Sequence, residues 1–429
     1  MPKLLQINTV VNSGSTGHIA EDIGKLAIAN GWESYIAYGR NVHPSSSRLI
    51  RIGNKVDILF HVLITRIFDL HGLASRHATK RFVKQINRIK PDVIHLHNIH
   101  GYYLNYKILF KYLAKSGIPV VWTMHDCWAE TGHCPCYTFV QCVARQSKYG
   151  CRKCPQKRGY PKSIFFSNAA YNFKQKKKYF NLLAENQLTI VTPSTWLSNE
   201  IGKSHLGHYR RIVINNGIDL NVFKPIPLKK KECEERKFII LGVANVWDER
   251  KGLNDFIKLS DFLNDDEQII IIGLSDNQRK KMPSKITGLP RTENLQKLIH
   301  YYSSADVYFN ASVEETFGMT NIEAQACGTP VIAYNSTAIP ETFSEQTGIL
   351  VERNNIYAVY NAIKKFRQTG KKHFYNKCIE YAANNFDKNV LFAKYISLYE
   401  KLGLNKIGGG KHRVVFVLSC AEGSYGTAA

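Results

Sequence analysis

The sequence lacks any apolar run that approaches the roughly eighteen residues of a membrane-spanning helix. The nearest run, Val56–Leu63, is short and is followed by Arg66 and Asp69. The N-terminal residues MPKLLQINTVV lack the pattern of a cleavable signal and instead predict a first strand. We therefore expect a protein without membrane spans that stays in the cytosol.

Acidic residues are scarce: 34 Asp and Glu stand against 58 Lys and Arg, which gives a formal net charge of +24. Such an excess favours anionic partners, whether nucleic acid, acidic lipid or phosphorylated small molecules. A nucleic-acid-binding protein would interleave its Lys and Arg with aromatic residues on one face. Here the basic residues are dispersed, with small clusters only at 174–178 and 229–231. Charge alone therefore names no partner.

Cysteines are few, but six of the ten fall in one short segment: Cys127, Cys134, Cys136, Cys142, Cys151 and Cys154. In a chain without a signal peptide, such clustering favours metal binding or reduced thiols over disulfides. Cys151-x2-Cys154, with Cys134 and Cys142 upstream, would form a tetrahedral zinc site that stabilises a long loop. Reduced cysteines packed within that loop are the alternative, and Cys127 and Cys136 are expected to be spectators of a zinc site.

Short β-branched runs alternate with longer amphipathic segments along the chain, which predicts parallel sheets with helices on both faces, the α/β class. The alternation stops at Asn216-Gly217 and restarts at Phe238, after a charged spacer over 229–236. Expected strands are 3–11, 34–38, 92–97, 120–124, 188–192, 238–243, 268–272, 307–310 and 331–333. Expected helices are 19–30, 78–89, 104–115, 195–203, 253–263, 295–303, 320–326, 357–366 and 388–402.

This organisation predicts two doubly wound, Rossmann-like domains, 1–223 and 224–385, that face each other across a cleft. The segment 386–406 is expected to return to the first domain as a helix. The tail 407–429 fits neither domain and is predicted to be disordered.

Ligands of open α/β sheets bind at the carboxyl ends of the strands, where four loops carry unusual residues. In the first loop, Gly14 and Gly17 let backbone N–H groups approach an anion. Their spacing is not GxGxxG, and no acid closes the second strand, which argues against a dinucleotide cofactor. In the second loop, His125 and Asp126 would orient a proton carrier or hold a substrate hydroxyl. A buried, hydrogen-bonded histidine is the other interpretation of His125.

The third loop places Arg250 and Lys251 at a helix start, where they would neutralise a diphosphate or form a solvated charge run. The fourth loop has two acids, Glu315 and Glu323, on either side of Gly318. Carboxylates accept hydrogen bonds from the paired hydroxyls of a sugar or ribose. Glu323 has apolar neighbours on its helix and, if buried, needs a partner.

Together these motifs resemble the GT-B glycosyltransferases of family 4 (group 1), the large retaining group that uses nucleotide-sugar donors. The resemblance covers roughly residues 3–400 and is strongest in the second half, where Glu315 and Glu323 match the E-x7-E signature. The segments Val191–Ser194, Asn216–Asp219 and Arg250–Gly252 fall in family order. The first half, with 123–128 and 131–134, resembles the branch that serves bacterial exopolysaccharide, colanic acid and O-antigen assembly.

The resemblance implies a role for each matching residue. Glu315, His125 and Lys251 would be catalytic, and His18 would lie on the acceptor side. The donor-binding residues would be Gly14, Asn245, Arg250, Lys251, Phe317, Gly318, Met319, Thr320 and Glu323. Asn245 stands where the family usually has an arginine, so one diphosphate-binding charge is missing and Arg250 is expected to compensate. The family needs no metal for transfer.

The implied reaction is retaining transfer of a hexose from a nucleoside-diphosphate sugar to a lipid-linked saccharide, in exopolysaccharide, capsule or O-antigen biosynthesis. The enzyme would lie at the cytoplasmic face of the inner membrane, an anionic surface that attracts Lys and Arg. The segment Asn54–Arg66, apolar with basic ends, would either enter that interface or form a buried core helix.

Two alternatives remain at this point. Another GT-B nucleotide-sugar enzyme, a phosphorylase or an epimerase, shares the fold, although the sequence has no pyridoxal-binding lysine motif. A nucleic-acid-binding protein with a zinc site would explain the charge and the cysteines. Because the acid pair would repel phosphates, we expect no nucleic acid partner.

Overall fold

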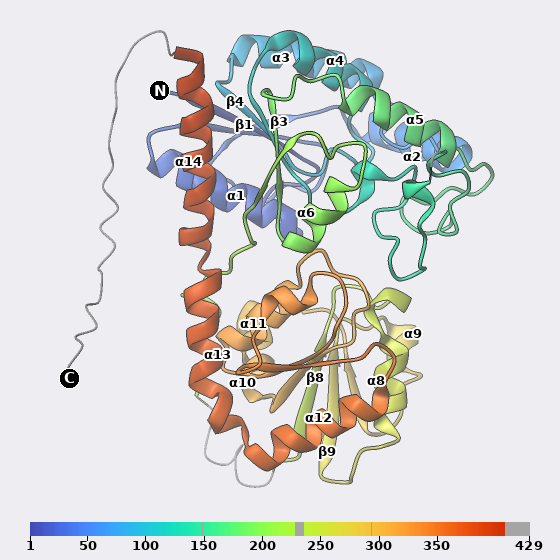
Figure 1. The fold of residues 1–429 in the computed structure, drawn as a ribbon, viewed down its shortest axis with the longest axis vertical. Helices are drawn as coiled ribbons and strands as arrows, with labels where there is room; N and C mark the ends of the chain where they lie inside the picture. The colour runs from blue at the N-terminus through green and yellow to red at the C-terminus, as the bar shows by residue number, and fades with distance from the viewer. Residues whose placement is uncertain (148, 228–235, 293, 408–429) are drawn as a thin grey trace, which may run out of the picture.

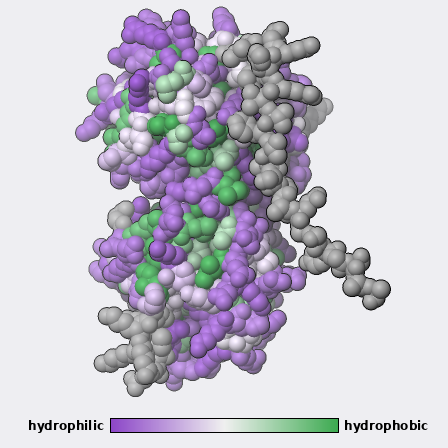
Figure 2. All heavy atoms as spheres, turned by 90° about the vertical axis from the view of Figure 1, so that its left-hand side faces the viewer, coloured by the Kyte–Doolittle hydropathy of each residue, from purple (hydrophilic) through white to green (hydrophobic). Residues whose placement is uncertain are grey.

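A computed structural model describes residues 1–147, 149–227, 236–292 and 294–407. The predicted spacer over 229–236 and the predicted tail over 407–429 lie almost entirely outside the described residues. Two parallel sheets, one above the other in Figure 1, form the two domains of the GT-B architecture expected from the sequence. Figure 2 shows them as two lobes, on a surface that is mostly hydrophilic.

The first domain is built on a seven-stranded sheet of order β3-β2-β1-β4-β5-β6-β7. Its buried central strands are the apolar runs read from the sequence, as expected for a parallel sheet covered on both faces. The strands are β1 (Lys3–Asn8), β2 (Glu33–Tyr38), β3 (Arg48–Arg51), β4 (Val93–Leu96), β5 (Val120–Thr123), β6 (Leu188–Thr192) and β7 (Arg210–Val213). The helices are α1 (Gly14–Ala29), α2 (Lys55–Phe68), α3 (Arg76–Ile89), α4 (Tyr106–Ser116), α5 (Ala169–Phe180) and α6 (Thr195–Gly202).

The second domain is built on a six-stranded sheet of order β10-β9-β8-β11-β12-β13. Its strands are β8 (Phe238–Val243), β9 (Glu267–Ile272), β10 (Ile286–Leu289), β11 (Val307–Asn310), β12 (Val331–Tyr334) and β13 (Gly348–Val351). Its helices are α8 (Leu253–Ser260), α9 (Asp276–Arg279), α10 (Leu295–Ser304), α11 (Met319–Ala326), α12 (Ile356–Thr369) and α13 (Lys371–Phe386). In both sheets the strand order reverses beside the first strand of the domain, which is where such folds bind ligands.

The last helix, α14 (Lys388–Ile407), packs against α1 of the first domain. Two of its tyrosines reach the buried sheet: the Tyr399 hydroxyl lies 2.6 Å from Nδ1 of His95, and the Tyr395 hydroxyl lies 3.1 Å from Oγ1 of Thr123. Breaking these buried hydrogen bonds would leave polar groups without partners, which costs free energy. The bonds therefore hold α14 against β4 and β5.

The chain crosses between the domains twice, and the two crossings are hydrogen-bonded to each other. The Ile218 N–H donates to the Phe386 carbonyl at 2.9 Å, and the Lys388 N–H donates to the Ile218 carbonyl at 3.1 Å. A Cβ on Gly217 would lie 2.3 Å from the Lys388 Cα, so only glycine fits there. The Lys388 ammonium contacts Asp219 at 2.9 Å and Asp22 at 3.2 Å.

The first helix begins at Gly14, earlier than the predicted Ile19, so the expected glycine loop is itself the first turn of α1. The sequence predicted none of the four edge strands, which are β10 and β13 in the second sheet and β3 and β7 in the first. Strands β3 and β7 have exposed charged side chains, and so they lack the apolar run that marks a central strand.

Helix α2 buries polar residues and exposes apolar ones, so the expectation of a buried core helix for this segment is wrong. Its only buried side chains are His61 and Thr65. Nε2 of His61 accepts the Gly72 N–H at 3.0 Å, and Nδ1 lies 2.8 Å from Oγ of Ser75. Because Nε2 accepts a backbone N–H, the imidazole is neutral, and burial lowers the pKa of His61 to about 3.

Acidification is expected to destabilise the protein through His61. An unfolded histidine titrates near pH 6.5, so the stability that this group contributes is present above that pH and is lost as the pH falls toward 3. Between pH 7 and pH 5 the loss is about 2 kcal/mol in the free energy of unfolding. Denaturant unfolding at both pH values checks it. In the His61→Gln variant, the free energy of unfolding should fall by about 2 kcal/mol less between pH 7 and pH 5. An unchanged fall would show that His61 is not the source of the pH dependence.

Candidate active site

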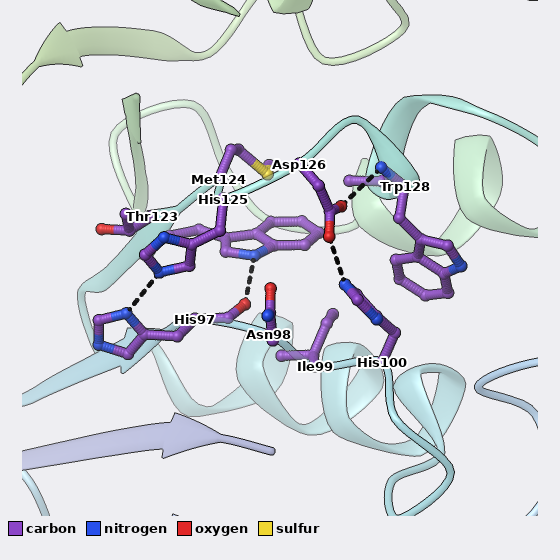
Figure 3. A pocket seen from close by; sticks show the side chains of 11 residues that line it. His97, Asn98, Ile99, His100, Thr123, Met124, His125, Asp126 and Trp128 are labelled. Carbon is purple, nitrogen blue, oxygen red and sulfur yellow. Dashed lines mark hydrogen bonds and ion pairs between the residues drawn. The ribbon is translucent and has the colours of Figure 1, made fainter. Parts of the chain in front are cut away.

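A pocket at the carboxyl ends of β4 and β5 is lined by polar side chains, four of which form two pairs (Figure 3). In one pair, Nε2 of His125 lies 3.0 Å from Nδ1 of His97, whose Nε2 lies 3.0 Å from Oε1 of Gln6. Burial lowers the pKa of His125 to about 4, although Asp126 opposes the shift. His125 is therefore a neutral, positioned hydrogen-bonding group near neutral pH.

In the second pair, Nε2 of His100 lies 2.9 Å from Oδ2 of Asp126. The Tyr160 hydroxyl lies 3.1 Å from the other ring nitrogen of His100. Burial would raise the pKa of Asp126, but His100 and the Trp128 N–H outweigh it and hold that pKa below its usual value. The pocket therefore presents the ionised carboxylate of Asp126 next to the neutral imidazole of His125.

Across the cleft, the loop after β11 carries the first acid of the E-x7-E pair. The Glu315 carboxylate contacts the Lys251 ammonium, and the Arg250 guanidinium lies 3.8 Å away. Burial alone would raise the pKa of Glu315, but Lys251 and Arg250 outweigh it, and the pKa lies below its usual value. Three predicted site residues thus form one ion cluster at the start of α8.

The second acid lies on α11. Oε2 of Glu323 accepts the Tyr302 hydroxyl at 2.8 Å, and burial raises the pKa of Glu323 above its usual value while this bond opposes the shift. Its helix neighbours Ile322 and Ala324 are buried, as expected, and the carboxylate remains partly exposed. Tyr302, on α10, is the partner that a buried acid needs.

The loop between the two acids lies against the first domain. Thr316 donates through Oγ1 to the His125 carbonyl at 2.9 Å, and its own carbonyl accepts the Ser194 hydroxyl at 2.8 Å. Gly318 has φ 111°, a conformation that side chains disfavour, and it leads directly into α11. The sequence therefore brings His125 and Glu315 to opposite sides of one interface.

Other predicted donor residues in this loop point elsewhere. Phe317 is buried and packs on Phe386, at 5.8 Å between ring centroids, and Met319 packs against the same cluster. Their side chains therefore support the loop, and only their backbone is available to a ligand. Thr320 is partly exposed and forms a hydrogen bond with the buried Tyr308.

Three predicted residues stand apart from these clusters. Gly14 is exposed at the start of α1, with open space where a Cβ would lie. His18, one turn later, is exposed, and its Nδ1 lies 2.9 Å from Oδ1 of Asn12. Asn245 is exposed after β8. Each lies at the carboxyl end of the first strand of its domain, on an accessible surface.

Glu314, which sequence reasoning did not single out, connects the domains. Its buried carboxylate accepts the N–H groups of Tyr137 and Phe139, both at 3.0 Å. The Arg353 guanidinium donates to the Phe139 carbonyl at 3.2 Å. Burial raises the pKa of Glu314. The long loop over 127–168, here called the insertion, is therefore bound to the second domain.

A buried ion cluster holds the insertion against the first domain. The Arg145 guanidinium contacts Glu130 at 3.1 Å and also contacts Glu200, and the side chains of Arg145 and Glu130 are 3% and 0% exposed. The Tyr137 hydroxyl donates to both acids at 2.9 Å. Burial raises the pKa of Glu130 to about 7, although Arg145 opposes the shift.

The four predicted zinc ligands carry free thiols within the insertion: Cys134, Cys142, Cys151 and Cys154. A hydrogen bond between Cys134 and Cys154 lowers the pKa of the Cys154 thiol. Among the residues that the structure describes, no three His, Cys, Asp or Glu side chains are arranged to hold a metal ion. The zinc site stays a prediction. Metal analysis of the purified protein tests it, and stoichiometric zinc is the expected result. Absence of zinc would contradict the prediction.

The described helices include none with the length and apolar character needed to cross a membrane. Comparison with solved structures shows the fold. Sucrose-phosphate synthase from Thermosynechococcus elongatus has a TM-score of 0.67 at 17% identity, over 94% of this chain and 100% of that one. HepE from Anabaena, solved with UDP, has a TM-score of 0.62 at 14% identity over 94% and 100%.

Comparison with protein sequences shows the family. The chain is 21% identical over 420 residues to WcaC of Escherichia coli (strain K12), a protein named for colanic acid biosynthesis, and the match covers 93% of this chain and 100% of that one. The model for Glycosyltransferase Family 4 matches residues 20–222, and the model for Glycosyl transferases group 1 matches residues 226–385. Each match corresponds to one domain of the structure, and the chain belongs to the GT-B glycosyltransferases of this family.

Proposed function

We propose that this glycosyltransferase moves a hexose, with retention of configuration, from a nucleoside-diphosphate sugar to a lipid-linked saccharide in surface polysaccharide biosynthesis. The observation that carries the proposal is the ion cluster of Glu315, Lys251 and Arg250 at the cleft. Two cations beside one carboxylate match a donor that offers a diphosphate next to a sugar with free hydroxyls. WcaC is named for colanic acid biosynthesis, which supports a saccharide product. HepE was solved with UDP, which supports a nucleoside-diphosphate donor.

The geometry suggests how a donor would be held. Lys251 and Arg250 would leave Glu315 for the diphosphate, which carries more charge than one carboxylate. Glu315, ionised because its pKa is lowered, would then accept hydroxyls of the hexose. Glu323 would accept the ribose hydroxyls next to Tyr302. In the transition state, charge grows on the departing nucleotide, and the same two cations would stabilise it without a metal ion.

The acceptor would approach from the first domain. His125 is neutral and positioned by His97, so it would serve as a hydrogen-bonding partner of the sugar. Asp126 and His100 form the neighbouring polar pair of the same pocket. His18, exposed on α1, would lie farther out along the acceptor path. We place this reaction at the cytoplasmic face of the inner membrane, where lipid-linked saccharides would present their head groups.

A panel of nucleotide sugars, scored by binding and by slow hydrolysis, tests the proposal. We expect the Glu323→Ala variant to bind the preferred donor about ten- to a hundred-fold more weakly, because hydrogen bonds to a charged group contribute about 1.5–3 kcal/mol. Isothermal titration measures it. The matched control Glu352→Ala removes an exposed acid of the same domain and should bind like the wild type. Failure of every donor, or unchanged binding by Glu323→Ala, would contradict the proposal.

A further inference from the structure

We propose that the outward face of α2, together with the segment Ile164–Phe166, docks this protein on an anionic lipid bilayer. Both elements belong to the first domain and lie away from the cleft contacts described above. The inference rests on the proposed function in one respect, because a lipid-linked acceptor would be reached from a bilayer. Bilayer binding itself is argued from separate observations and can be measured without donor or acceptor.

The first observation is the apolar face of α2. Four side chains recur at the spacing of a single helix face, and all are largely exposed: Val56 at 72%, Leu59 at 70%, Phe60 at 55% and Leu63 at 51%. A soluble helix usually turns such residues inward, yet the inward positions here are the polar His61 and Thr65. The side of α2 that would normally form a core is therefore turned to the surroundings.

A second segment extends the same apolar surface. The Ile164 N–H donates to the Arg66 carbonyl at 2.7 Å, and the rings of Phe166 and Phe68 stack at 5.9 Å between centroids. Ile164, Phe165 and Phe166 are 47%, 67% and 55% exposed. Hydrogen bonds to carbonyls at the end of α2 therefore place three more apolar side chains beside the helix. Ile164–Phe166 thus add exposed apolar side chains at the C-terminal end of α2.

The charges around this surface favour an anionic lipid over a protein. Lys55 lies at the start of α2, Arg66 near its end, and Lys162 beside Ile164, all exposed. Helix α5, also basic, is joined to this end of α2 because the Asn168 amide donates to the Phe68 carbonyl at 2.7 Å. The sequence over 131–184 contains no Asp or Glu. Apolar side chains within a basic rim match the acyl boundary and phosphates of a bilayer.

The surface is connected to the candidate acceptor pocket through a short stretch of chain. Tyr160, whose hydroxyl lies 3.1 Å from His100, stands four residues before Ile164. The Lys157 ammonium donates to the Phe165 carbonyl at 3.2 Å, which ties both ends of this stretch together. A bilayer in contact with Phe165 would therefore lie beside the wall of the pocket that contains Asp126. A lipid-anchored saccharide would have a short path to the site.

Flotation of the full chain with vesicles tests the inference. The wild type should float with vesicles rich in phosphatidylglycerol and remain free with pure phosphatidylcholine, and added salt should weaken the binding. The Leu59→Ser/Phe60→Ser variant should bind the anionic vesicles about ten-fold or more weakly, because both side chains lose their transfer into the interface. The matched control Tyr357→Ser/Val390→Ser removes two side chains that are 68% and 62% exposed elsewhere, and should bind like the wild type.

A second measurement separates docking from misfolding. The Phe60→Trp variant should show a blue-shifted emission with anionic vesicles, and both double variants should keep the donor hydrolysis of the wild type in the absence of vesicles. Equal flotation of wild type and Leu59→Ser/Phe60→Ser would overturn the inference. So would light scattering that shows a wild-type dimer dissolved by these substitutions, since a second copy would then cover the face. Vesicle binding without any donor hydrolysis would instead contradict the proposed function alone.

Discussion

The Lys251→Ala variant is expected to lose about a hundred- to a thousand-fold in the rate of transfer, the cost of removing one preorganised partner of a developing negative charge. Lys251 lies just before α8 with its ammonium on Glu315, and Arg250 beside it offers a second cation to a diphosphate. The resemblance to the family puts the uncharged Asn245 where an arginine is usual, so we expect only Arg250 to compensate for the lost charge, and only in part. Initial rates with saturating donor measure the effect.

The control for Lys251 lies on α8, the helix that follows it. Lys258 is 65% exposed and 3.8 Å from Asp255, and the Lys258→Ala variant should transfer at the wild-type rate. Lys251→Arg should recover part of the lost rate because it restores the charge with a different shape. A Lys251→Ala enzyme within a few-fold of the wild type would show that the diphosphate is neutralised elsewhere.

The Arg145→Met variant is expected to lose about 3–5 kcal/mol of the free energy of unfolding, the usual cost of leaving buried charges without their partner. Glu130 and Glu200 would both remain near the Tyr137 hydroxyl with no cation between them. Because Tyr137 also supplies one of the N–H groups that Glu314 accepts, the insertion should loosen from the loop after β11 as well. Denaturant unfolding and protease susceptibility of the insertion measure both effects.

Two further variants separate charge from packing in this cluster. Arg152→Met removes an exposed arginine of the same insertion and should change stability by no more than about 0.5 kcal/mol. Adding Glu130→Gln to Arg145→Met removes the most buried unpaired charge and should restore part of the loss. Equal stability of the single and double variants would argue that Arg145 acts through packing alone.

The sequence predicts those parts of the structure that depend on residues close together along the chain. Apolar runs identify the central strands, and Glu315 to Glu323 mark the loop and helix after β11. What the sequence does not predict are partners that lie far apart along the chain. Tyr302 reaches Glu323 from another helix, and Glu314 binds an insertion more than a hundred residues upstream. No periodicity in the sequence encodes such pairs, because the fold alone brings them together.

Helix α2 shows a different limit. Its residues predict an amphipathic helix, and the pattern alone left open whether its apolar side lies inside. The answer depends on what covers that side in the folded domain, which is decided by neighbours such as Ser75 and Gly72. His97 and His100 could have been suspected, since both follow β4 beside the strand that leads to His125.

The paired crossings at Ile218 and Phe386 have a mechanical consequence. A relative rotation of the two domains would pivot near this point, where the two chain segments are bonded to each other and Lys388 pairs with Asp22 and Asp219 of the first domain. Displacement grows with distance from an axis, and the insertion lies on the opposite side of the molecule from α14 (Figure 1). A small rotation would therefore part Glu314 from Tyr137 and Phe139 before it disturbs the axis. If the proposed function holds, spent nucleotide would leave along the edge that carries the insertion.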